Sequence, residues 1–168
     1  SACFARFSGL RYEERRGRPW LTEPKTEVLI NDGRNHLALT RRRYDVIASE
    51  PSNPWMAGVG NLFTKEAFTL MRDRLNSGGI MCQWLQGYGL EADHFYCIVH
   101  TFAQVFPHVQ LWHCGSLDFL LIGSTEKLEA PAARLRARLA EPAIKEWLAR
   151  THLDTPPEFL AALLAGEA

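Results

Sequence analysis

The sequence has no apolar run approaching the roughly 20 residues that a membrane-spanning helix needs, and its start shows no secretory signal pattern. We therefore expect no direct membrane insertion. The 19 basic and 19 acidic residues cancel to a net charge of zero, so nucleic acid is not an expected partner. Neither an H-E-x-x-H nor a C-x-x-C pattern is present, which predicts no metal site. Four scattered cysteines favour reduced thiols and a cytoplasmic location.

The 168 residues, 46% of them apolar, are enough to build one domain with a buried core. Short apolar runs alternate with segments of helical period, which predicts an α/β fold with a mainly parallel sheet and flanking helices. The expected strands are Glu27–Asn31, Tyr44–Ser49, Ile80–Leu85, Val109–His113 and Leu117–Ile122, the last two forming a C-terminal antiparallel hairpin. The expected helical segments are Asn35–Thr40, Thr64–Leu75, Glu91–Phe106, Glu126–Leu148 and Phe159–Leu164. Residues 1–125 are expected to form the domain, and 126–168 a helical extension packed on it.

The residues that follow each strand are the candidates for chemistry, because open α/β sheets bind ligands beyond the carboxyl ends of their strands. Glu50 follows an apolar strand and precedes Pro51, which holds it in the extended region. A carboxylate fixed in this way suits a general base or a cation-binding group, but an exposed loop acid fits the pattern equally well. Asp32 could accept a hydrogen bond from a ligand, although Asp before Gly is also a common turn residue or helix N-cap.

Several short motifs follow one another in a specific order. They are Asp32-Gly33-Arg34, Tyr44-Asp45-Val46-Ile47, Glu50-Pro51-Ser52-Asn53-Pro54, Leu62-Phe63-Thr64-Lys65-Glu66 and Leu75-Asn76-Ser77-Gly78-Gly79. Each is weak alone, but the ordered set, which covers roughly residues 26–124, resembles the C-terminal part of the spermidine synthase family. The Glu-Pro-Ser-Asn-Pro-Trp form is similar to a branch often fused to membrane transporter segments. The resemblance implies a class I methyltransferase-like (Rossmann-like) fold.

The resemblance also implies an activity. Family members transfer an aminopropyl group from decarboxylated S-adenosylmethionine, a co-substrate and not a tightly bound cofactor, to a polyamine. Glu50 would stand in place of the family's catalytic aspartate, and Asn53 in place of a second aspartate that binds the amine. Glu50 is one methylene longer than aspartate and Asn53 is neutral, so the identity of the acceptor stays open.

Four further residues take roles by the same resemblance. Gln83 would line the crevice and Trp112 would contact the substrate, while Asp32 and Gly33 would contact the adenosyl ligand. Nothing before residue 26 resembles the family's Gly-rich loop or the strands around it. We therefore expect weak or no nucleotide binding by the chain alone.

Two alternatives remain open at this point. One is an S-adenosylmethionine-dependent methyltransferase, and the other is a non-catalytic module of the same fold. Family members commonly form homodimers, which makes a homodimer a further expectation. If the longer protein carries transporter-like segments, the domain would be tethered at a membrane without entering it.

Overall fold

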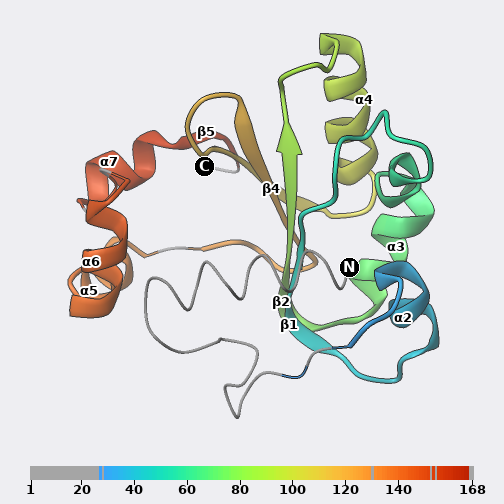
Figure 1. Ribbon diagram of the computed structural model, residues 1–168. Coiled ribbons are helices and arrows are strands. Elements are labelled where there is room, and N and C mark those ends of the chain that lie inside the picture. The colour runs from blue at the N-terminus through green and yellow to red at the C-terminus, as the bar shows by residue number, and fades with distance from the viewer. Residues whose placement is uncertain (1–26, 28, 130, 152, 154, 167–168) are drawn as a thin grey trace. The chain divides into compact units, whose positions relative to one another are not determined.

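The computed structural model describes residues 27, 29–129, 131–151, 153 and 155–166. The chain divides into two compact units, residues 1–39 and 40–168, and each is described by itself (Figure 1). The expectations for the segment before residue 26 lie outside the described residues.

The described part of the first unit contains one short helix, α2, at Gly33–Leu39. Asp32 begins the helix, because its Oδ1 accepts a hydrogen bond from the backbone N of Asn35 at 2.8 Å. This is the N-cap arrangement, in which a side chain satisfies an otherwise unpaired N–H of the first turn. The helical turn expected just after Asp32 is therefore confirmed.

The strand expected at Glu27–Asn31 is wrong for the residues that the structure describes. None of them has strand structure, and the side chains of Leu29 and Ile30 are 53% and 76% exposed. A run of β-forming residues becomes a strand only where a second backbone can pair with it. The described chain offers this segment no such partner.

The second unit is built on a five-stranded sheet with the order β1-β2-β4-β3-β5. Its strands are β1 (Tyr44–Ser49), β2 (Leu75–Gln86), β3 (His108–His113), β4 (Asp118–Ser124) and β5 (Leu163–Ala165). The pairing of β1 with β2 is parallel, and the other three pairings are antiparallel. The α/β class and the β3–β4 hairpin are confirmed. The sheet is nevertheless mixed and not mainly parallel, because β4 lies between β2 and β3 and runs against both.

β2 begins earlier in the chain than the sequence predicts. The glycine pair at Gly78 reads as the end of a helix running to Leu75, but Leu75 already pairs with Tyr44 on β1. The next paired residues are Val46 and Ile80, so the intervening residues of β2 form a bulge. Gly78 has φ +67°, a conformation that favours glycine at bulges.

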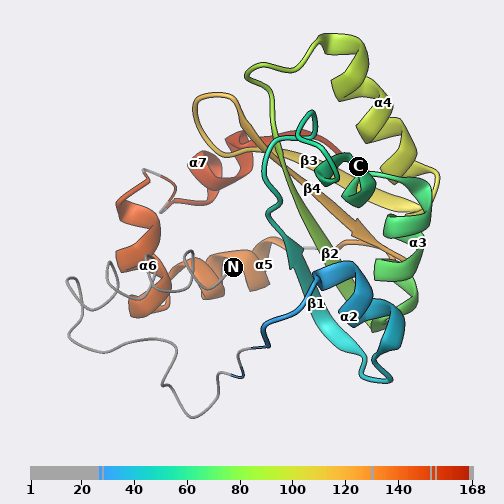
Figure 2. The same ribbon diagram turned by 45° about the vertical axis from the view of Figure 1, so that its right-hand side comes forward.

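Two helices, α3 (Lys65–Asp73) and α4 (Ala92–Ala103), cover one face of the sheet, as Figure 2 shows. Thr64, the first residue of the expected helical segment, is the N-cap of α3: its Oγ1 accepts from the backbone N of Ala67 at 3.3 Å. The short 3-10 helix η2 (Val59–Leu62) precedes it. α4 lies within the helix expected at 91–106, which is confirmed apart from its last turn.

The core lies between these helices and the sheet. The rings of Phe68 and Phe102 are fully buried and meet edge to face at 5.0 Å. A Cβ at Gly123 of β4 would stand 2.6 Å from both Phe102 and Phe106. Glycine at this position therefore lets α4 pack directly against the strand.

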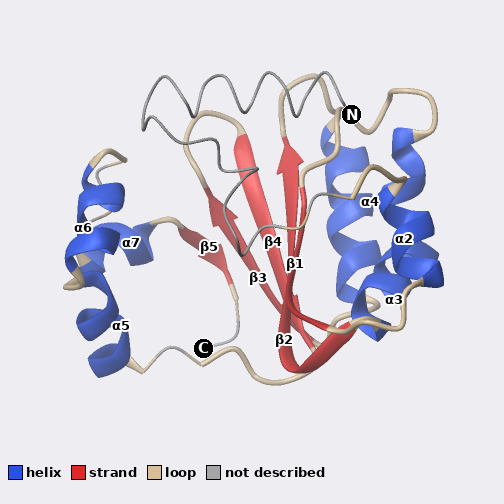
Figure 3. Ribbon diagram, turned by 60° about the horizontal axis from the view of Figure 1, so that its bottom comes forward, coloured by secondary structure: helices blue, strands red, loops and turns tan. Residues whose placement is uncertain are grey.

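The C-terminal residues form three short helices and a strand, where two helices are expected. The helices are α5 (Ala132–Leu139), α6 (Pro142–Ala149) and α7 (Pro156–Ala161). Pro142 divides the expected helix 126–148, since proline lacks the N–H that an unbroken helix needs. The end of the expected last helix is strand β5, which pairs with β3. α5, α6 and α7 lie across the sheet from α3 and α4 (Figure 3).

Candidate functional site

The loop after β1 carries the predicted catalytic residue. Glu50 follows Ser49, the last residue of the strand, and is exposed. Pro51 restricts it to extended backbone, and the loop then folds into turns, with Met56 N donating to Asn53 O at 3.0 Å. The loop thus presents a carboxylate at the carboxyl end of a parallel strand, where ligands bind in such folds.

Asn53 is tied to the last residue of the neighbouring strand. Nε2 of Gln86 donates a hydrogen bond to Oδ1 of Asn53. The Gln86 side chain is 0% exposed, so this bond anchors the loop at the carboxyl end of β2. The sequence patterns do not identify Gln86, because the predicted strand stops one residue earlier. A polar residue at the true strand end is the signal that points to it.

Gln83 is also fully buried, at 0% exposure. Its Nε2 donates to the backbone O of Ser49 at 3.3 Å and to the backbone O of Trp84 at 2.9 Å. The side chain therefore links the ends of β1 and β2, within reach of the residue that precedes Glu50.

Asp118 joins the same end of the sheet from β4. It is the cross-strand partner of Gln86, and the β3–β4 turn fixes its backbone, with Cys114 N donating to Asp118 O at 2.8 Å. Burial first, and the Asp118 carboxylate second, raise the pKa of the Cys114 thiol. The sequence patterns do not identify Asp118, since only the strand pairing brings it to this place.

Three buried side-chain oxygens at this end of the sheet lack a hydrogen-bond partner within the described part of the chain. They are Gln83 Oε1, Gln86 Oε1 and Asp118 Oδ1. Leaving one buried polar group unpaired costs about 1–3 kcal/mol, so each of these atoms calls for an explanation. All three atoms are acceptors, which means that a group rich in donors would satisfy them.

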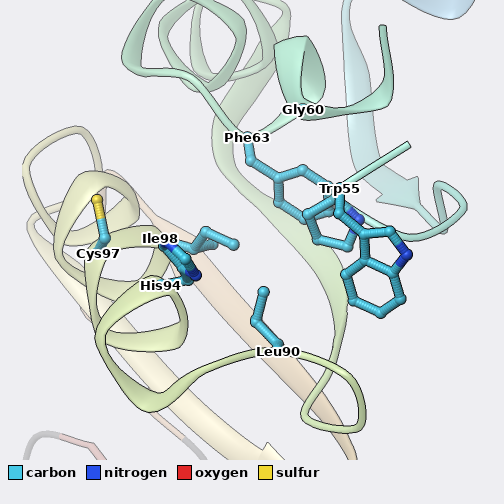
Figure 4. Close-up of a pocket in the computed structure, with 8 residues that line it drawn as sticks. Trp55, Gly60, Phe63, Leu90, His94, Cys97 and Ile98 are labelled. Carbon is cyan, nitrogen blue, oxygen red and sulfur yellow. The ribbon is translucent and has the colours of Figure 1, made fainter. Parts of the chain in front are cut away.

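An apolar pocket of about 420 Å³ opens beside the loop. Figure 4 shows Trp55 and Phe63 on one side of it, with Leu90 below and Ile98 on α4 opposite. A Cβ at Gly89 would stand 2.9 Å from the ring of Trp55, so glycine there allows the indole to lie against the loop after β2. The pocket adjoins the loop that carries the candidate carboxylate and offers space for the apolar part of a ligand.

Trp112 is not brought together with Gln83. The strand pairing aligns Trp112 with Leu120 and Gln83 with Leu121, and successive residues of a strand point to opposite faces of a sheet. Trp112 and Gln83 therefore lie on opposite faces. Asp118, two residues before Leu120, lies on the same face as Trp112.

The Trp112 indole makes a hydrogen bond within β3 and a ring contact with one of the C-terminal helices. Its Nε1 donates to Gln110 Oε1 at 3.0 Å. Its ring packs on Phe159 of α7 at 5.2 Å, and all three side chains line a separate cavity beneath those helices.

The two residues predicted to contact the adenosyl ligand lie in the other compact unit. Asp32 uses one carboxylate oxygen to cap α2, and Gly33 is the first residue of that helix. A Cβ at Gly33 would meet nothing within 4 Å, so no close packing demands glycine there.

The described residues contain no group of three or more histidine, cysteine, aspartate or glutamate side chains that could hold a metal ion. No helix among them is long and apolar enough to span a bilayer.

Comparison with known proteins identifies the family. Residues 11–114 match the model of the spermine/spermidine synthase domain, so the match begins before the segment that carries the motifs. Spermidine synthase of Dictyostelium discoideum is 25% identical over 115 residues, which cover 64% of this chain and 40% of that protein. The chain spans about half the length or less of the curated relatives it matches.

Solved structures show the same fold. A spermidine synthase in complex with the transition-state analogue AdoDATO matches with a TM-score of 0.58 at 17% identity, covering 86% of this chain and 56% of that one. Human Methyltransferase-like protein 13 in complex with SAH matches with a TM-score of 0.55 at 18% identity, covering 88% and 67%. The class I methyltransferase-like fold is thereby confirmed. The chain belongs to the spermine/spermidine synthase family.

Proposed function

We propose that this chain contributes to an aminopropyltransferase, which transfers an aminopropyl group from decarboxylated S-adenosylmethionine to a polyamine. The observation that carries the proposal is the family match over residues 11–114, which includes the Glu50 loop anchored at the carboxyl end of β2. In this reaction, the acceptor nitrogen forms a C–N bond as the C–S bond of the sulfonium breaks. Methylthioadenosine leaves, and the nitrogen loses a proton.

Glu50 is the candidate general base. An alkyl ammonium group has a pKa near that of lysine, about 10.4, so the attacking amine must lose a proton in the site. The exposed Glu50 carboxylate attracts the cation, orients it and can pass the proton to water. Because the sulfonium is an activated leaving group, alignment of the two reactants supplies much of the remaining rate.

The remaining site residues are assigned as follows. Asn53 and Gln83 would bind the acceptor amine, and the Asp32 carboxylate would accept from the adenine amino group beside Gly33. Substrate contact by Trp112 remains a prediction, since its indole bonds to Gln110 and packs on Phe159. A homodimer, a cytoplasmic location and tethering at a membrane also remain predictions.

The test is an amine-dependent assay on the full-length protein that carries these residues. Decarboxylated S-adenosylmethionine is supplied with putrescine, spermidine or cadaverine, and released methylthioadenosine is measured. The proposal predicts release that requires an amine and yields an aminopropylated product. If S-adenosylmethionine instead donates a methyl group, or if no amine supports release, aminopropyl transfer is ruled out.

A further inference from the structure

The amine site faces an electrostatic problem if the proposed function is correct. A diamine that attacks through one nitrogen keeps a positive charge on the other, and a buried cation is costly unless a carboxylate pairs with it. Asn53 is neutral, and by the family resemblance it would stand in place of an aspartate. The loop after β1 therefore supplies one carboxylate, that of Glu50, to a ligand that needs two.

A second carboxylate lies at the same end of the sheet, at the start of β4. Asp118 and Gln86 are cross-strand partners, so their Cβ atoms are about 4.5–5.5 Å apart. Gln86 in turn donates to Asn53. The three side chains thus form a continuous polar row, from the loop after β1, across the end of β2, to the start of β4.

The unpaired atoms in this row match a cation and not an anion. Gln86 is fully buried, and its Oε1 and the Oδ1 of Asp118 have no hydrogen-bond partner among the described residues. An ionised carboxylate accepts hydrogen bonds only, whereas an ammonium group carries three donors and no acceptor. A charge-assisted bond between them is about twice as strong as a neutral one. A phosphate or carboxylate ligand would find no donors at these two atoms.

We propose that Asp118 supplies the second negative charge of the acceptor-amine site, in place of the charge that Asn53 lacks. The proposal rests on the proposed function and names a residue that determines specificity in it. The Asp118 carboxylate binds the ammonium group distal to the attacking nitrogen. Gln86 Oε1 accepts a second hydrogen bond from the same group. Acceptors with a distal cationic nitrogen are thereby selected over monoamines.

Substitution of the charge alone tests this role. Asp118→Asn keeps the size of the side chain and removes its charge. In the full-length protein we expect the KM for putrescine to rise about tenfold or more, while the dissociation constant of methylthioadenosine stays unchanged. The preference for putrescine over propylamine should fall by a similar factor. Equilibrium binding of putrescine to the methylthioadenosine complex gives the same comparison without turnover.

Moving the negative charge from position 118 to position 53 tests whether Asp118 recognises the amine or only supports the fold. The double variant Asp118→Asn/Asn53→Asp restores the net charge on the other side of Gln86, and the carboxylate introduced at position 53 would still accept from Gln86. We expect its KM to return to within about threefold of the wild-type value. Asp45→Asn is the matched control, since Asp45 is exposed at the other end of the sheet, where Asn76 donates to it at 2.7 Å.

The outcomes separate the role of Asp118 from the proposed function. An active wild-type enzyme whose KM for putrescine and diamine preference are unaltered by Asp118→Asn would overturn the role of Asp118 and leave the proposed function intact. A raised KM that the double variant does not recover would also overturn it, in favour of a structural role. A wild-type protein that is inactive with every amine refutes the proposed function itself.

Discussion

The two ends of the central sheet treat their polar groups differently. At the amino-terminal end of β2, the polar side chains pair with one another or with backbone. The pairs are Arg43 Nη1 to Leu75 O at 2.8 Å, Asn76 Nδ2 to Asp45 Oδ1 at 2.7 Å, Ser77 Oγ to Glu126 Oε1 at 2.5 Å, and Ser124 Oγ to Gly79 O at 3.1 Å. At the carboxyl-terminal end, three buried oxygens have no partner among the residues that the structure describes.

The difference indicates which end is built for a ligand. Stability alone favours pairing of every buried polar group, and the amino-terminal end meets that requirement. The carboxyl-terminal end departs from it at the position where open α/β sheets bind ligands. Departures from local consistency concentrate at functional sites. The comparison therefore predicts that substitutions at one end change stability, and that those at the other change activity.

The largest expected effect is on turnover. Glu50→Gln in the full-length protein should lower kcat by about 10²- to 10⁴-fold, because the side chain can no longer accept a proton. The free energy of unfolding should change by less than about 0.5 kcal/mol, since Glu50 is exposed. Methylthioadenosine release and urea denaturation measure the two quantities.

Glu126→Gln is the control for Glu50 at the opposite end of the sheet. Glu126 accepts from Ser77, and we place it outside the site. This variant should keep the wild-type kcat. A large loss of turnover in Glu126→Gln, or none in Glu50→Gln, would reverse the assignment of the two ends.

A substitution at Ser124, near the amino-terminal end of β2, should change stability and leave activity unaltered. Its hydroxyl is buried, donates to Gly79 O and accepts from the backbone N of Glu126 at 3.1 Å. Ser124→Ala leaves both groups without their partner and should lower the free energy of unfolding by about 1–3 kcal/mol. The KM for the amine should not change. Urea denaturation checks the first expectation, and an altered KM would show that the two ends are not independent.

Gln86→Met should change activity but not stability, whereas Ser124→Ala should change stability but not activity. Methionine has a similar volume, and the substitution removes an unpaired buried oxygen together with the bond to Asn53. The two effects offset each other, so the free energy of unfolding should stay within about 1 kcal/mol of wild type. The KM for the amine should rise. A loss of several kcal/mol would show that Gln86 serves the fold and not the ligand.

The smallest expected effect is on thiol reactivity. Burial and the Asp118 carboxylate raise the pKa of Cys114, and the thiolate is the form that reacts. Asp118→Asn removes the second cause, so this pKa should fall and a larger fraction of the thiol should be ionised at a pH of about 8.5, near the ordinary thiol pKa. Iodoacetamide labelling, resolved by peptide mass analysis, should then be faster at Cys114 and unchanged at Cys97. Equal rates at Cys114 would place Asp118 away from it.

Local sequence patterns predict α2, α3, α4 and most of the strands, but not the division of the C-terminal residues into α5, α6, α7 and β5. The expected helices 64–75 and 91–106 contain α3 and α4, because helical periodicity and end signals lie within one element. The segment 27–31 shows the limit of such patterns, since its β-forming residues depend on a partner strand. Local patterns also do not predict that the sheet is mixed, because the position of β4 between β2 and β3 depends on the folding of the whole chain.

The candidate site divides in the same way. Glu50 and Asn53 lie in one proline-containing loop, which a sequence motif can reveal. Gln86 and Asp118 are 32 positions apart in the chain and meet only through antiparallel pairing. Trp112 and Gln83 show the reverse case. The family resemblance places both at the substrate, but the strand register puts them on opposite faces of the sheet.

The most direct test is a crystal structure of the full-length protein with methylthioadenosine and putrescine. We predict one amine nitrogen beside Glu50 and the other about 2.7–3.1 Å from Asp118 and from Gln86 Oε1. A diamine bound with both nitrogens away from Asp118 and Gln86 would contradict this arrangement. The unpaired oxygens at this end of the sheet would then need another explanation.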